Sequence, residues 1–138
     1  MSHFAPDILQ KNDEAQKVYQ KWTHLPVKSL RSTLDYYRDK LGFTDEWTVG
    51  DKDGGIRRDD LRLLFAEDSD FTNDINNRNH RLPLMWFVDD IDAVYAEFRN
   101  RDIDLEDDLR THPYGLREFA FIDINGYYIR VADQIEDK

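Results

Sequence analysis

The feature that most constrains the fold of this 138-residue chain is a repeated pattern, in which two segments match at an offset of 61 residues. In each copy, an alternating strand leads into a Ser or Asp and then into apolar residues at i, i+4 and i+7, which predicts a capped amphipathic helix. The matched positions are Leu25, Val27, Ser29, Leu30, Leu34 and Tyr37, and then Trp86, Val88, Asp90, Ile91, Tyr95 and Phe98. A shared pattern of this kind indicates a duplicated structural unit.

Short strands follow the predicted helix in both copies. The helix of the first copy ends near Gly42, and alternation with turn residues then favours three strands, at about 43–48, 55–59 and 61–67. The second copy repeats the order, with a strand at 82–88, a helix at 91–100, a short strand at 105–109 and a closing hairpin. The sequence therefore predicts an α+β chain built from two βαβββ modules.

The domain organisation follows from this plan. A chain of 138 residues is large enough to bury one core without disulfides or metals. The apolar spacing of the first residues predicts an additional amphipathic helix. We expect a single domain over 1–138, with an N-terminal helix at 6–21, module one at 22–68, a polar linker at 69–81 and module two at 82–134.

Composition excludes several classes of function. Asp and Glu number 29 against 19 Lys and Arg, and the resulting charge of −10 repels phosphate backbones, which argues against nucleic-acid binding. The same field would attract a cationic ligand, although solubility alone also explains it. There is no cysteine, and no apolar run long enough for a signal peptide or a membrane span, so we expect a soluble cytoplasmic protein.

Strand alternation assigns side chains to two faces, because neighbouring residues point to opposite sides of a sheet. The apolar repeat positions, together with Phe119 and Phe121, are expected to pack under the helices. The opposite face then carries Trp22, His24 and Pro26 in the first copy, and Pro83, Met85 and Phe87 in the second. Tyr127, beside the Asn-Gly turn of the closing hairpin, is expected on the surface or in a dimer contact.

The closing loop and hairpin carry a resemblance to a known family. The run Pro113-Tyr114-Gly115-Leu116-Arg117-Glu118-Phe119, with Leu41-Gly42-Phe43 and the repeat, resembles the vicinal-oxygen-chelate superfamily, and in particular its bleomycin-resistance branch. The resemblance covers about 22–134. It implies a curled mixed sheet whose concave side forms a ligand cleft, helices on the convex side, and a homodimer. In this loop, Arg117 is expected to act as an anchor through a salt bridge.

The resemblance also locates the metal positions of the family enzymes. These enzymes hold a divalent ion with His, Gln or Glu at four concave positions, which correspond here to Trp22, Leu64, Pro83 and Arg130. None of these four coordinates a metal, so the resemblance implies a metal-free protein without a cofactor. The alternative is a displaced divalent-metal site at His24 and Glu118, and thus a glyoxalase-like lyase or dioxygenase.

The bleomycin-resistance branch implies a binding function. Its members sequester a cationic aromatic drug in clefts shared across a dimer, so that resistance to the antibiotic comes from binding. The corresponding ligand-binding residues here are Trp47, Phe87, Tyr114, Glu118, Tyr128 and Arg130. The chain has no Cys nucleophile, Gly-x-Ser-x-Gly motif or Gly-rich phosphate loop, so no catalytic residues are assigned. Another small ligand, or a protein-binding role for the N-terminal helix, stays open.

Overall fold

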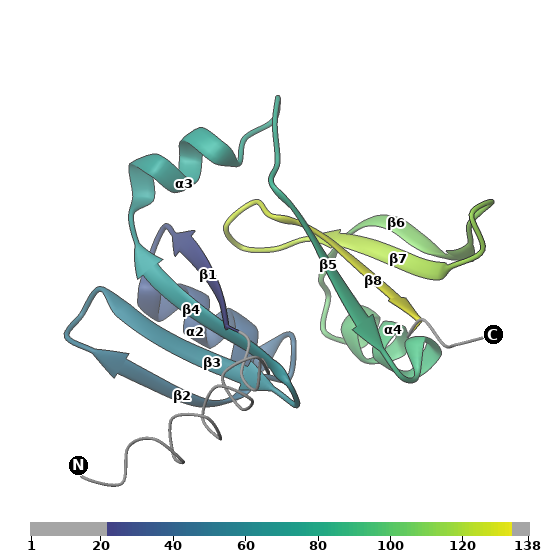
Figure 1. Ribbon diagram of the computed structural model, residues 1–138, viewed down its shortest axis with the longest axis horizontal. Coiled ribbons are helices and arrows are strands. Elements are labelled where there is room, and N and C mark those ends of the chain that lie inside the picture. Colours follow the sequence, from purple (N-terminus) through teal and green to yellow (C-terminus); the bar gives the residue numbers. More distant parts are fainter. Residues whose placement is uncertain (1–21, 134–138) are drawn as a thin grey trace, which may run out of the picture.

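The computed structural model describes residues 22–133, and the helix expected at 6–21 lies outside the described residues. The chain alternates strands and helices in two similar halves (Figure 1). In order, the elements are β1 Trp22–Val27, α2 Leu30–Asp39, β2 Thr44–Val49, β3 Asp53–Arg58, β4 Leu61–Glu67, α3 Ser69–Ile75, β5 Pro83–Val88, α4 Ile91–Asn100, β6 Asp104–Thr111, β7 Arg117–Ile122 and β8 Tyr128–Asp133.

The strands form two mixed four-stranded sheets, in the orders β1-β4-β3-β2 and β5-β8-β7-β6. In each sheet the first strand pairs in parallel with the last strand of its module, and the other pairs are antiparallel. This confirms the two βαβββ modules. The resemblance implied one curled mixed sheet. The strands instead form two separate sheets side by side, and β1 and β5 are edge strands of these sheets (Figure 1).

The repeat is visible in the element bounds, since β5 and α4 begin and end 61 residues after β1 and α2. Both helices are capped as the sequence predicts. The Ser29 hydroxyl accepts a hydrogen bond from Ser32 N (3.3 Å), and the Asp90 carboxylate accepts one from Ala93 N (3.1 Å). These caps satisfy backbone donors that the first helical turn leaves without partners.

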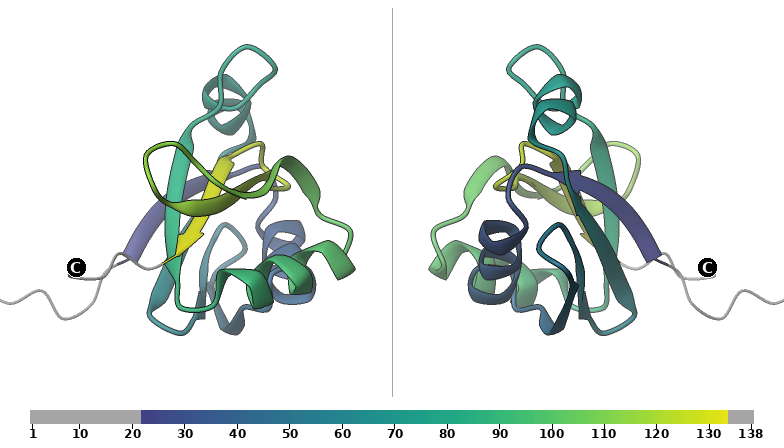
Figure 2. Two further views of the ribbon diagram at one scale, coloured as in Figure 1. Left: turned by 90° about the vertical axis from the view of Figure 1, so that its right-hand side faces the viewer. Right: turned by 90° about the vertical axis from the view of Figure 1, so that its left-hand side faces the viewer.

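The linker, predicted as polar and without secondary structure, contains a short helix. Residues Ser69–Ile75 form α3, and Asp68 caps it by accepting from Phe71 N (3.1 Å). The Asn and Asp residues that favour a loop by composition thus supply the cap and the polar exposed side of a short helix. Side views show α3 at one end of the molecule, away from α2 and α4 (Figure 2). None of the helices within 22–133 is long and apolar enough to cross a membrane.

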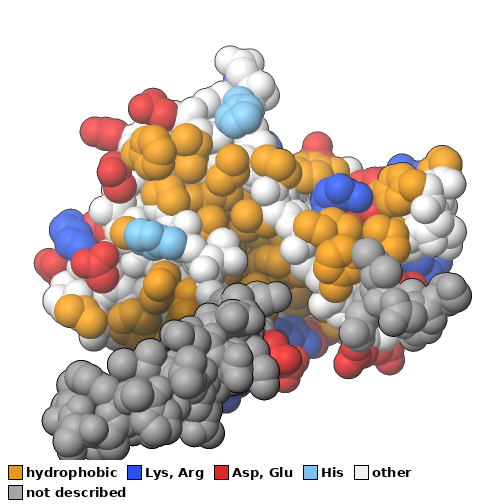
Figure 3. Space-filling model, viewed as in Figure 1, with side chains coloured by type: hydrophobic (Ala, Val, Ile, Leu, Met, Phe, Trp, Pro, Cys, Tyr) orange, Lys and Arg blue, Asp and Glu red, His pale blue; other side chains and the backbone are white. Residues whose placement is uncertain are grey.

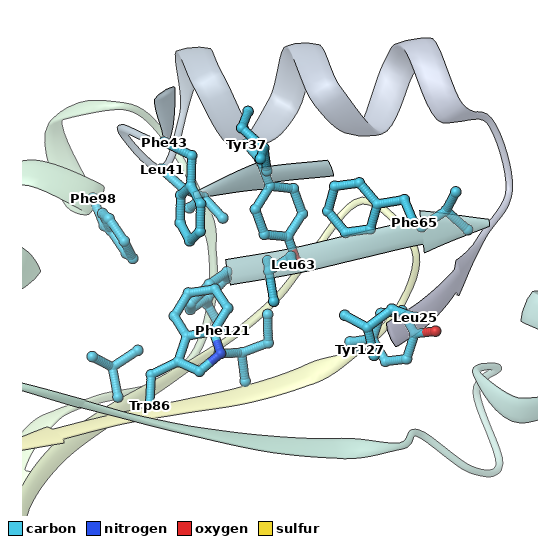
Figure 4. Packing of buried hydrophobic residues seen from close by; sticks show 14 of the residues in the cluster. Leu25, Tyr37, Leu41, Phe43, Leu63, Phe65, Trp86, Phe98, Phe121 and Tyr127 are labelled. Carbon is cyan, nitrogen blue, oxygen red and sulfur yellow. The ribbon is translucent and has the colours of Figure 1, made fainter. Parts of the chain in front are cut away.

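The apolar core is continuous between the modules. The Trp86 ring from β5 lies 6.4 Å from that of Tyr37 on α2 and 5.7 Å from that of Phe43, measured between centroids (Figure 4). Phe119 and Phe121 are fully buried, as predicted. Because side chains from both modules fill one core, the modules are expected to fold as one unit.

The turn between β7 and β8 joins the two modules, and it corrects one prediction. Five residues separate Ile122 from Tyr128, and Tyr127 in this turn is 0% exposed, although it was expected on the surface or in a dimer contact. Its phenol donates to Pro26 O (2.6 Å), and its ring lies beside Leu25 (Figure 4). The turn bends into the first module, so a residue beside an Asn-Gly turn becomes part of the core.

Candidate functional site

The face of the second sheet that lies opposite α4 carries five of the six predicted ligand-binding residues. Strand register places Arg130 beside Met85 and Ala120, so Glu118, Tyr128 and Phe87 share its side of the sheet. Phe87 is 46% exposed at the edge strand β5. Tyr114 reaches the same group of residues from the loop between β6 and β7.

Arg130, Glu118 and Tyr114 form one hydrogen-bonded cluster on this face. Arg130 Nε donates to Glu118 Oε2 (2.7 Å), and Arg130 Nη2 donates to Glu118 Oε1 (2.8 Å) and to the Tyr114 hydroxyl (3.0 Å). Tyr114 also donates to Glu118. The Glu118 side chain is 3% exposed, yet the bonds from Arg130 hold the pKa of its carboxyl below the usual range. Glu118 is therefore an ionised, fully engaged group that fixes the other two side chains.

The Tyr114 ring is held from two further directions. The His112 ring stacks on it at 5.1 Å between centroids, and the Arg130 guanidinium lies 5.7 Å from the ring centroid. Arg117 anchors the loop, as predicted, because its Nη2 lies 2.8 Å from Asp92 on α4. Tyr114 nevertheless remains 58% exposed, so a rigid aromatic surface faces outward.

The corresponding face of the first sheet carries the sixth predicted residue, Trp47, together with a tryptophan that was not in the predicted set. The Trp47 indole lies over Gly55, where an added Cβ would come within 2.7 Å of ring atoms. The Trp22 ring meets Trp47 edge-on, with centroids 6.1 Å apart. Trp22 could have been included from its sequence, because alternation already placed it on this face.

The six predicted residues therefore fall into two groups on two sheets. Glu118, Arg130 and Tyr114 are in direct contact, with Phe87 and Tyr128 on the same face, whereas Trp47 belongs to the aromatic pair with Trp22 on the other sheet. Apolar side chains gather across the middle of the molecular face that Figure 3 displays, over both sheets. Exposed aromatic groups of this kind mark a contact surface.

The residues of these two faces do not fit the metal site of the family enzymes. Glu118 gives both carboxylate oxygens to Arg130, and His24 lies on β1 in the other sheet. Within residues 22–133, no group of three or more His, Cys, Asp or Glu side chains is arranged to hold a metal ion. The two bonds from Arg130 leave Glu118 without an oxygen free to coordinate a metal ion in this arrangement.

Comparison with solved structures finds the same fold in TioX, in a bleomycin-binding protein and in a lactoylglutathione lyase. TioX from Micromonospora sp. ML1 superposes with a TM-score of 0.70 at 14% identity, covering 86% of this chain and 100% of TioX. The bleomycin-binding protein from bleomycin-producing Streptomyces verticillus, complexed with copper(II)-bleomycin, gives 0.67 at 21%, covering 86% and 98%. Lactoylglutathione lyase from Agrobacterium tumefaciens gives 0.64 at 16%, covering 85% and 94%. Identities this low show the fold alone.

A family model decides the membership of the chain. No curated protein matches this chain. Residues 19–131, which span both modules, match the model described as Glyoxalase/Bleomycin resistance protein/Dioxygenase superfamily. The duplicated βαβββ fold and this match together show that the chain belongs to the glyoxalase/bleomycin resistance protein/dioxygenase superfamily.

Proposed function

We propose that this protein binds a flat, cationic aromatic small molecule in clefts shared between the two subunits of a homodimer. The observation that carries the proposal is the exposure of fixed aromatic rings on both open sheet faces. Trp22 is 37% exposed, Trp47 39%, Phe87 46% and Tyr114 58%. Aromatic rings left in water at this density gain free energy when a planar ligand covers them.

The preference for a cation rests on charge and on aromatic geometry. The chain carries a net charge of −10, which raises the local concentration of cations around it. Aromatic faces add a contribution of about 0.5–2 kcal/mol for each well-placed cation. Glu118 is engaged by Arg130, so in this proposal it positions Arg130 and Tyr114 and does not itself bind the cation.

The separation of the two groups of aromatic residues is the reason for proposing a cleft shared between subunits. Trp47 and Trp22 lie on the first sheet, while Tyr114 and Phe87 belong to the second module. A second copy that places its second module against this first module would bring the two groups around one ligand. Two such clefts would form in a symmetric dimer. The fold is shared with two bleomycin-binding proteins in complex with bleomycin, which supports a small-molecule ligand for this chain.

Titration with metal-free bleomycin tests the proposal. We expect saturable quenching of tryptophan fluorescence, because Trp22 and Trp47 are exposed and Trp86 is buried. Calorimetry should then show that Trp47→Ala weakens binding by about fivefold or more, the equivalent of one lost stacking contact. Phe71→Ala on α3 is the matched control, since it removes a 50% exposed aromatic ring outside both faces.

Two outcomes would contradict the proposal. If bleomycin at micromolar concentration leaves the fluorescence unchanged while a neutral quencher reaches Trp47, bleomycin is not a ligand. If a ligand binds tightly but sedimentation shows a monomer throughout, the cleft is not shared between subunits.

A further inference from the structure

A separate cavity of about 460 Å³ lies between the two modules, on the helix side of the second sheet. Its wall includes the apolar side chains of Phe43, Trp86, Val94 and Phe98. Its rim carries the carboxylates of Asp59, Asp60, Asp89 and Asp90. Trp86 faces the core, on the opposite side of the sheet from Arg130 and Tyr114, and the neighbouring residue Phe87 borders the cavity from the edge strand β5.

The repeat explains why the cavity exists. On the first module, the turn between β7 and β8 occupies a niche formed by Pro26, Lys28, Thr33 and Tyr37. In the second module, the positions 61 residues later are Phe87, Asp89, Val94 and Phe98, and all four line the cavity. The cavity is therefore the second module's counterpart of a niche that is filled in the first module.

Turn length makes the difference between the two niches. Five residues connect β7 to β8, and they carry Tyr127 into the first module. Two residues, Asp59 and Asp60, connect β3 to β4, which is too few to place a side chain at the corresponding depth. The space that an aromatic ring occupies in one niche is left open in the other.

The filled niche shows what chemistry suits the empty one. In the first module, the occupant is a phenol ring whose hydroxyl donates to the backbone carbonyl of Pro26. The counterpart of Pro26 is Phe87, which borders the cavity. The acidic rim adds a requirement for positive charge. Arg58, which also lines the cavity, does not neutralise this rim, because Glu97 holds its guanidinium at 2.7 and 2.9 Å.

We propose that this cavity binds a small arylalkyl amine, with its ring in the place that Tyr127 has in the first module and its ammonium group at the aspartate rim. The ring would contact Trp86 and Phe98, and the rim carboxylates would select a cation over an anion of the same shape. The inference does not depend on the function proposed for the open faces.

Amide NMR spectra of the full chain, titrated with three probes of matched shape, test this proposal. Tyramine carries the phenol and the ammonium, para-ethylphenol the phenol alone, and para-hydroxyphenylpropionate the phenol with a carboxylate. We expect millimolar tyramine to cause saturable shifts at Asp89, Asp90 and Phe98, with affinity falling as salt rises. Para-ethylphenol should bind more weakly, and the carboxylate probe should not bind.

Variants then locate the site. Val94→Phe fills the cavity from α4 and should abolish the shifts, and a thermal melt checks that the variant is folded. The double change Asp60→Asn with Asp89→Asn should reduce tyramine affinity by about fivefold. Asp74→Asn on α3 is the matched control, because it removes one exposed carboxylate outside the cavity.

Three results would overturn the inference. The first is the absence of saturable shifts at the cavity residues, and the second is equal binding of all three probes, which would show no selection for charge. The third is tyramine binding that Trp47→Ala abolishes and Val94→Phe leaves intact. That result would place tyramine on the open faces, so the cavity would fail while the proposed function would stand. If tyramine fills the cavity and bleomycin does not bind, the proposed function alone loses its support.

Discussion

The turn between β7 and β8 packs into the first module, whereas the turn between β3 and β4 stops at the rim of a cavity in the second module. The receiving niches are built from matching positions of the repeat, yet one is filled by Tyr127 and the other is bordered by Asp59 and Asp60. The duplicated unit gives both niches the same backbone frame. The length of one turn then decided which niche became core and which stayed open.

The filled niche is also the more polar one inside. Asp123 is buried in it, where it accepts from the Tyr37 hydroxyl (2.6 Å) and from the backbone N–H groups of Asn125 and Tyr127 (2.9 Å each). Asn125 extends this network, because its carboxamide accepts from Lys28 N (2.8 Å) and donates to Thr33 Oγ1 (3.0 Å). Buried polar groups that are fully bonded specify one docking geometry for the turn.

Tyr127→Ala should have the largest effect, because it removes a fully buried ring from the filled niche. We expect it to lower the free energy of unfolding by about 3–5 kcal/mol, measured by chemical denaturation. Tyr127→Phe is the control, since it removes only the bond to Pro26 O, worth about 1 kcal/mol. A loss of less than about 1 kcal/mol for Tyr127→Ala would mean that the Tyr127 ring contributes little to the packing of the first niche.

Asp123→Asn should change how stability depends on pH. Burial raises the pKa of Asp123 from 3.8 to about 6, so between these values the folded chain keeps a proton that the unfolded chain has released. Stability from this group is therefore highest at low pH and falls as pH rises through this window. A shift of two pKa units corresponds to a free energy on the order of 3 kcal/mol.

The asparagine variant cannot titrate at this position, so the fall should be absent from its unfolding free energy measured from pH 4 to pH 7. The difference between wild type and variant isolates Asp123 from other carboxyl groups. Parallel curves for the two proteins would show that Asp123 ionises normally and that the filled niche is not as dry as its burial indicates.

Asp59→Gly, in the turn beside the open niche, should cause the smallest change in the free energy of unfolding. Asp59 has a φ of 52°, in the left-handed region that favours glycine, so the substitution should stabilise the chain by about 0.5 kcal/mol. Asp60 lies outside that region, so Asp60→Gly should instead lose a similar amount. Thermal melts compare the two. If both substitutions change the melting temperature in the same direction, the positive φ of Asp59 does not destabilise this turn.

Much of the fold was predictable because its signals are local. The repeat, both helix caps and the buried Phe119 and Phe121 follow from periodicity, which each segment carries within itself. The strand register places Glu118 on the face that carries Arg130, and alternation with the buried Phe119 is consistent with this. The salt bridge that anchors the loop through Arg117 was predicted from the loop sequence and is present at 2.8 Å.

The features that were missed depend on contacts distant in the sequence. Tyr127 is buried because its turn meets Pro26, 101 residues away along the chain. Glu118 was predicted as a ligand-binding residue, and its pairing with Arg130 on the neighbouring strand could not be read from spacing along the chain. The short helix α3 is capped by Asp68, in a segment whose composition alone favours a loop.

The two modules, the faces of their strands and the acidic character of the surface could be predicted, because each of these depends on residue type and spacing along the chain. Three-dimensional contacts were needed to show that the two sheets are separate, that Arg130 lies on Glu118 and Tyr114, and that one niche is filled while its counterpart is a cavity. The physical reason is that periodicity acts within a few residues. The docking of a turn depends instead on its length and on partners from the other half of the chain.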